Sequence, residues 1–152
     1  MRNPKDVLEA LASALRLIPE VLEAVDSADR IRVYDDVFLA GRQLAAEISN
    51  LSVPSILVAY RSTSPGSIAR RETWAHQLSA ILRVRDPLTV FTAIVNGVPS
   101  DGTQRLIYRE LSAGLHRMET PTLQRQQIIT SESPFATLDY FELIITIKEK
   151  GD

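Results

Sequence analysis

The stretch from Pro54 to Arg85 constrains the fold most, because it predicts a long antiparallel pair of strands. Ser55–Ser62 is a continuous apolar run rich in β-branched and aromatic residues, which is typical of a buried strand. Glu72–Val84 alternates apolar and polar residues, so one face should pack on a core while the other meets water or a partner. The polar loop Thr63–Arg71 joins them, and we expect it to project because the second strand exceeds the usual strand length.

The loop carries both turn signals and positive charge. Pro65 and Gly66 fit the two central positions of a type II turn, because proline fixes φ and glycine accepts a positive φ. The arginines near the loop could be solvated, could contact a phosphate backbone, or could pair with carboxylates of a neighbouring subunit. The residues that we expect to contact a subunit or partner are Arg61, Ser64, Pro65, Gly66, Arg70, Arg71, Gln77, Arg83 and Arg85.

Helices and further strands are predicted on both sides of this hairpin. Helical spacing of apolar residues predicts helices over Pro4–Ile18, Pro19–Asp26, Val37–Asn50, Pro87–Asn96 and Thr103–Leu115. An N-cap residue followed by proline marks the start of the first and the fourth of these helices. Alternating or β-branched runs predict strands over Arg30–Tyr34, Leu123–Ser131 and Leu138–Glu149, with a frayed end over Lys148–Asp152.

We therefore expect one α+β domain over residues 1–152 with two layers. Its sheet should have about four antiparallel strands, with the helices on one face and the polar faces of the long strands uncovered.

Composition narrows the class of protein. With 152 residues, 45% hydrophobic and 24% charged, the chain matches an ordinary single globular domain. A net charge of −2 argues against a dedicated nucleic-acid binder, which would show a basic excess. The absence of cysteine excludes disulfides and thiolate metal sites. The amphipathic start is not a signal peptide, and no apolar run is long enough to span a bilayer.

No catalytic, cofactor-binding or metal-binding residue is predicted. Asp35 and Asp36 fit a helix cap better than a carboxylate pair for acid–base chemistry. His76 has no ligand at metal spacing and fits a packed or hydrogen-bonded structural residue beside Trp74, a core anchor. His116 fits a helix C-terminus. The loop lacks the spacing of a phosphate-binding loop, and no Gly-x-Ser-x-Gly elbow is present.

The chain resembles a known family in the hairpin and at its end. It contains "VPSILVAYRSTSPGSIARRETWAHQLSAILRVRD" and a late strand, "DYFELIITIKEKG". This is similar to the small tail-completion, or tail-terminator, proteins of long-tailed bacteriophages, in which a "P-S-I-L-V-x-Y" strand leads to a "W-x-H-x-L/F-x-I-x-L/V-R" strand. The matching residues are Pro54, Ser55, Ile56, Val58, Tyr60, Trp74, His76, Leu78 and Arg83.

The resemblance implies a structural protein of the virion and not an enzyme. Members of the family form a ring, usually of six subunits, that caps the tail tube and joins it to the head connector, while the genome passes through the lumen. The implied partners are other copies of the chain, tail-tube protein and the connector or neck proteins. DNA would pass without specific binding, and no membrane, cofactor or small-molecule substrate is implied. The implied location is the tail or neck of the virion, after assembly in the host cytoplasm.

Other functions stay open at this point. One alternative is a head-completion or connector adaptor of the neck, which differs from a tail terminator mainly in that it binds the portal side. A small ligand-binding module or enzyme on the same scaffold would need a concave pocket with convergent polar groups. A regulatory or toxin–antitoxin partner would form a stable heterodimer with a neighbour.

Overall fold

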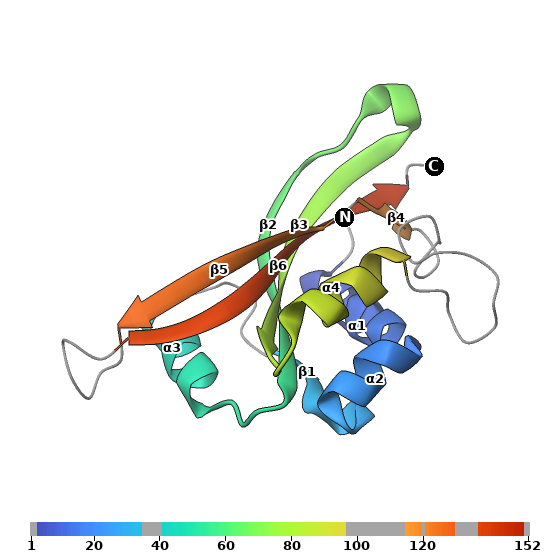
Figure 1. The fold of residues 1–152 in the computed structure, drawn as a ribbon. Helices are drawn as coiled ribbons and strands as arrows, with labels where there is room; N and C mark the ends of the chain where they lie inside the picture. Colours follow the sequence, from blue (N-terminus) through green and yellow to red (C-terminus); the bar gives the residue numbers. More distant parts are fainter. Residues whose placement is uncertain (1–2, 35–40, 97–114, 120, 130–136, 151–152) are drawn as a thin grey trace.

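A computed structural model describes residues 3–34, 41–96, 115–119, 121–129 and 137–150. In chain order the elements are α1 (Pro4–Leu15), α2 (Pro19–Val25), a 3₁₀ turn η1 (Ala28–Arg30), β1 (Ile31–Val33), α3 (Gly41–Asn50), β2 (Ser55–Pro65), a 3₁₀ turn η2 (Ile68–Arg70), β3 (Glu72–Arg83), α4 (Pro87–Asn96), β4 (Leu115–Met118), β5 (Thr122–Ile129) and β6 (Thr137–Lys150). The predicted α+β class is confirmed (Figure 1).

The described strands form one sheet of six, larger and less uniform than predicted. The order is β1-β2-β3-β6, and both β4 and β5 pair with the outer side of β6. Because β6 is 14 residues long, it accommodates β5 along its first part and β4 near its end. β1 runs parallel to β2, whereas every other pair is antiparallel. The parallel pair is possible because the chain between the two strands includes α3 and can cross over.

One face of the sheet packs against α1, α2 and α4. The core there consists of Val7, Leu8, Leu11, Ala12, Ala14, Leu15, Ile18, Val21, Val25, Ile31, Ile56, Val58, Tyr60, Leu78, Ala80, Leu82, Val90, Ile94, Met118, Leu143, Ile145 and Ile147. The start signals act as predicted: the Asn3 side chain accepts a hydrogen bond from the Lys5 amide, and Asp86 caps α4 by accepting one from the Thr89 amide at 3.2 Å. Burial of alternate strand residues thus fixes which sheet face the helices cover.

α3 packs on the opposite face, which corrects the prediction of helices on one face only. The second core contains Tyr34, Ile48, Leu51, Leu57, Ala59 and Ile81, with Tyr140 packed against it. The physical reason is the run Ile56–Tyr60, which is apolar at every position and so needs cover on both faces. Burial raises the pKa of Tyr140, and the nearby Glu142 charge raises it further against the opposing effect of Arg61.

The hairpin of β2 and β3 extends past the helices, and its outer half forms the top of the molecule in Figure 1. The register holds from Ser55 opposite Arg83 to Pro65 opposite Trp74, with a bulge between Tyr60 and Ser62. Trp74 was predicted to anchor the core, but it lies on this outer half and is only partly buried. β1 covers β2 only as far as Val58, so the outer part of β2 is an edge among the described strands.

The hairpin tip differs from the predicted type II turn at Pro65 and Gly66. Pro65 still belongs to β2, and the Gly66 amide donates to the Thr73 carbonyl at 2.9 Å, so the chain reverses further out. The tip closes because the Ser67 carbonyl accepts from the amides of Arg70 and Glu72. A Cβ atom on residue 66 would lie 2.6 Å from the Glu72 carbonyl oxygen, which explains the glycine there.

Several expectations fall on other parts of the chain. The cap at Asp35 and Asp36 and the body of the helix over 103–114 lie outside the described residues. Leu115 and His116 lie in β4, and the helix end that was predicted near His116 lies outside the described residues. The segment Lys148–Lys150 was predicted to fray, but it belongs to β6 and pairs with β3 and β4, which hold it in place.

Candidate functional site

Five of the nine predicted interface residues lie together at the outer end of the hairpin. Ser64 and Pro65 end β2, Gly66 starts the tip, and Arg70 and Arg71 lie just before β3. All but Gly66 are exposed. Arg71 adopts a φ of 57°, which directs the chain back into β3. The tip is therefore a compact, exposed loop with two adjacent positive charges.

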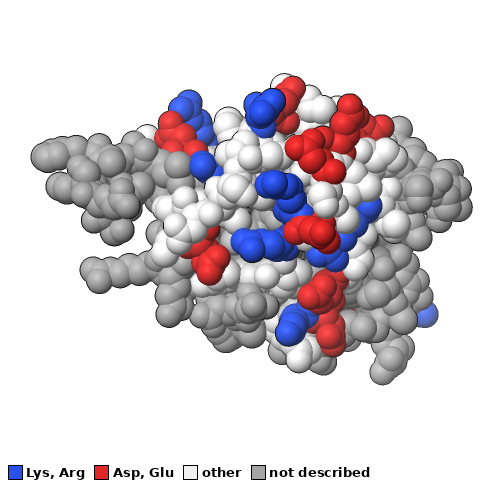
Figure 2. Space-filling model, turned by 90° about the horizontal axis from the view of Figure 1, so that it is seen from below, with Lys and Arg blue, Asp and Glu red and all other residues white. Residues whose placement is uncertain are grey.

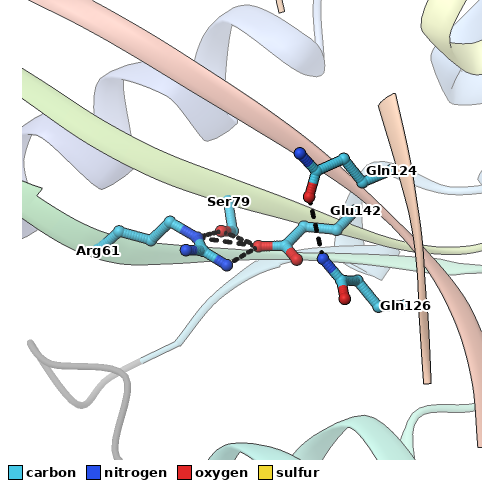
Figure 3. A network of polar contacts seen from close by, with 5 residues as sticks. All are labelled: Arg61, Ser79, Gln124, Gln126 and Glu142. Carbon is cyan, nitrogen blue, oxygen red and sulfur yellow. Dashed lines mark hydrogen bonds and ion pairs between the residues drawn. The ribbon is translucent and has the colours of Figure 1, made fainter. Parts of the chain in front are cut away.

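Arg61 lies elsewhere, in the middle of the hairpin on the sheet face that α3 also covers. Its guanidinium donates to Glu142 Oε1 from Nε at 2.9 Å and from Nη2 at 2.6 Å, and Nε also donates to the Ser79 hydroxyl (Figure 3). The Ser79 hydroxyl donates to the same carboxylate. The Glu142 side chain is 4% exposed and that of Arg61 34%. Arg61 is thus bound within its own chain, and its ion pair connects residues of β2, β3 and β6.

A polar band crosses the sheet from this ion pair. Gln124 lies opposite Glu142 on β5, and the Gln126 amide donates to the Gln124 side-chain oxygen at 3.0 Å (Figure 3). Gln77, a predicted interface residue, lies opposite Thr146 on the same face and is only partly buried. The prediction that polar strand faces stay uncovered therefore holds for Gln77 and fails for Ser79, which is fully buried.

A second buried network of polar side chains lies on the other face of the sheet, at the base of the outer hairpin. His76 Nε2 lies 2.8 Å from a Glu149 carboxylate oxygen, and His76 Nδ1 lies 2.8 Å from the Tyr60 hydroxyl, which also contacts Thr63. A carboxylate only accepts, so Nε2 carries the proton and, in the neutral ring, Nδ1 accepts from Tyr60. Burial, and secondarily the Glu149 charge, raises the pKa of Tyr60.

The geometry of this network closes His76 off from solvent. A histidine oriented by a carboxylate is the arrangement that activates a nucleophile in many enzymes. Here the ring is 0% exposed, and the nitrogen that would face a substrate is already bonded to Tyr60. The prediction that His76 is a packed, hydrogen-bonded residue is confirmed.

Arg83 and Arg85, the last two predicted residues, lie at the opposite end of β3. Arg83 donates to the Asp139 carbonyl at 3.4 Å. Arg85 is exposed and lines a groove between α2 and the start of α4. The structure therefore separates these two residues from the hairpin tip.

The groove along α2 and α4 has two adjoining hollows that share Glu20 and Thr89. The first, about 550 Å³, has an apolar lining that includes Pro19, Leu88 and Ala93. The second, about 380 Å³, is lined by the carboxylates Glu20, Glu23, Asp26 and Asp86 and by Arg85. Hydrogen bonds, first from the Thr89 hydroxyl and then from its amide, lower the pKa of Asp86, so this carboxyl stays ionised at neutral pH.

The described residues of the lower face present no broad basic surface. Figure 2 shows acidic and basic side chains interleaved over the lower face of the molecule. Within the described ranges, no three histidine, aspartate or glutamate side chains are placed to hold a metal ion. None of the described helices is long and apolar enough to cross a membrane.

Sequence reasoning found the tip but missed the buried acids and the groove. Glu142 alternates with apolar residues in β6, and Glu149 stands between two lysines near the chain end, so both look solvent-facing in the sequence. Their partners are 63 or more residues away in the chain. Comparisons of the chain with family models, curated proteins and solved structures find no match.

Proposed function

We propose that this chain is a structural protein of a phage tail, a tail terminator that forms a closed ring, the sixfold ring of the family that it resembles. The observation that carries the proposal is the outer hairpin, which extends past the helices and exposes its tip and one strand edge. A ring needs two different, complementary surfaces on each subunit. A projecting hairpin supplies one of them at one end of the molecule.

The charge distribution supports passage of DNA through such a ring. The net charge is −2, and charges of both signs interleave on the lower face (Figure 2). Several phosphate contacts would hold DNA tightly, because each contact contributes to affinity by releasing counterions. A lumen without a strong basic field would let the genome pass. The partners under this proposal are other copies of the chain, tail-tube protein and the head connector.

Shortening the hairpin tests the proposal. Deleting residues 64–69 leaves Thr63 opposite His76, with residues 70–75 as the new loop, so the buried Tyr60–His76 contact stays. We expect a folded monomer, with circular dichroism and an unfolding midpoint close to those of the parent, that no longer forms rings or binds the end of a tail tube. The matched control is the full-length hairpin with Ser67→Ala, because Ser67 holds the tip through its backbone carbonyl and not through its side chain.

If the deletion variant assembles and docks normally, the hairpin is not the assembly element. Binding separates the tail terminator from a neck adaptor. A terminator is retained by tail-tube protein in a pull-down, whereas retention by the portal or connector alone would indicate the adaptor.

A further inference from the structure

The groove along α2 and α4 has the features of a surface that is covered in an assembly. The described residues expose three large hydrophobic side chains: Leu88 at 63%, Val53 at 50% and Leu17 at 44%. Leu88 lines the groove, Val53 precedes the lining residue Pro54, and Leu17 lies two positions before the lining residue Pro19. Leu88, the most exposed of the three, lies in the groove beside a charged rim, which is typical of an interaction site.

The rim of the groove is acidic. Glu20, Glu23, Asp26 and Asp86 are all exposed there, and Arg85 is the one cation among its lining residues. The groove thus has an excess of negative charge over an apolar floor. An occupant of matching chemistry would carry adjacent positive charges on a narrow, partly apolar element.

The hairpin tip of a second copy has this chemistry. Its exposed residues Arg70 and Arg71 are adjacent, and the neighbouring Pro65 and Ala69 are exposed small apolar groups. Figure 1 shows the tip and α2 at opposite ends of the molecule, so the tip does not reach the groove of its own chain. Two complementary surfaces at opposite ends of one subunit give head-to-tail contacts, and such contacts close into a ring when the rotation fits.

We propose that the tip of each subunit inserts into the α2–α4 groove of the next, with Arg70 and Arg71 against the carboxylates of α2. This rests on the proposed ring and names the two surfaces that build it. Guanidinium groups form bidentate pairs with carboxylates, which set the register as well as adding affinity. The pairs also steer the encounter, so assembly should weaken as salt rises.

Charge reversal on each side tests the contact. One variant carries Arg70→Glu and Arg71→Glu, and the other carries Glu20→Lys and Glu23→Lys. Each alone should raise the concentration at which half of the protein is assembled by about tenfold or more, because like charges then face each other. A control with Glu9→Lys and Glu47→Lys has the same charge change as the groove variant at exposed positions on α1 and α3, and it should assemble like the parent.

Mixing the two variants is the decisive step. In an alternating ring every contact is then complementary: the reversed tip meets the reversed groove, and the unchanged tip meets the unchanged groove. Two assembly-deficient proteins should therefore form rings when mixed in equal amounts, as measured by light scattering and negative-stain images.

The outcomes separate this inference from the proposed function. If the parent forms rings but both variants also do, or if the mixture stays unassembled, the tip–groove contact is wrong and the ring proposal stands. If the groove variant forms rings and only loses tail-tube binding, the groove serves that partner instead, which also overturns the inference. A parent protein that stays monomeric at every concentration overturns both.

Discussion

Replacing Arg61 by methionine should lower the free energy of unfolding by about 2–4 kcal/mol, as measured by urea denaturation. The change leaves the Glu142 carboxylate, whose side chain is 4% exposed, with the Ser79 hydroxyl but without its cation. Removing one partner of a buried ion pair strands the other charge in a region of low dielectric. We place the expected loss toward the lower part of the usual range because Arg61 itself is 34% exposed.

Arg125 offers a matched control on the same sheet. It pairs with Asp139 at 2.9 Å, and the two side chains are 69% and 45% exposed. Arg125→Met should therefore cost about 1 kcal/mol or less. Adding Glu142→Gln to Arg61→Met should recover part of the loss, because the uncompensated charge is then gone. Equal costs for the two arginine variants would show that Arg61 is not a buried partner in solution.

Replacing His76 by leucine should cost a similar amount, about 2–4 kcal/mol in the same assay. The ring is fully buried and bonds Glu149 on one side and Tyr60 on the other, and leucine ends both contacts. The affected strands β2, β3 and β6 join the globule to the outer hairpin. We therefore expect amide exchange to speed up most at residues 72–78 and 145–149.

Tyr60→Phe is the companion variant. It removes only the hydroxyl and leaves the His76–Glu149 bond, so it should cost about 1–3 kcal/mol and less than His76→Leu. Adding Glu149→Gln to His76→Leu should restore stability in part. If His76→Leu is as stable as the parent, the Tyr60–His76–Glu149 contacts contribute nothing to stability, and apolar packing alone holds the base of the hairpin.

Local patterns predicted the elements better than their arrangement. Asn3-Pro4 and Asp86-Pro87 gave the starts of α1 and α4 correctly, because an N-cap followed by proline is a signal complete within a few residues. The amphipathic pattern of α3 indicated a helix but not which sheet face it covers. The parallel orientation of β1 likewise depends on the crossover between β1 and β2. The three residues of β1 carry no sequence pattern that would predict it.

The polar contacts could not be predicted for a related reason. Glu142 follows the period-two pattern of a solvent-facing residue in β6, and its cation lies on β2, 81 positions away in the chain and on the far side of β3. The groove acids come from α2 and from the loop before α4, which are far apart in the chain. The tip was predictable because its exposure follows from two long strands and a polar loop between them.

The mass of the purified protein in solution, measured by light scattering over a concentration series, tests the ring most directly. We expect the mass to rise with concentration to a plateau at one multiple of the 16.9 kDa chain and to stay there, because a closed ring has no free ends. With the sixfold symmetry of the family that the chain resembles, the plateau would lie near six chains. A mass of one chain at every concentration, or a mass that keeps growing without a plateau, would contradict the closed ring.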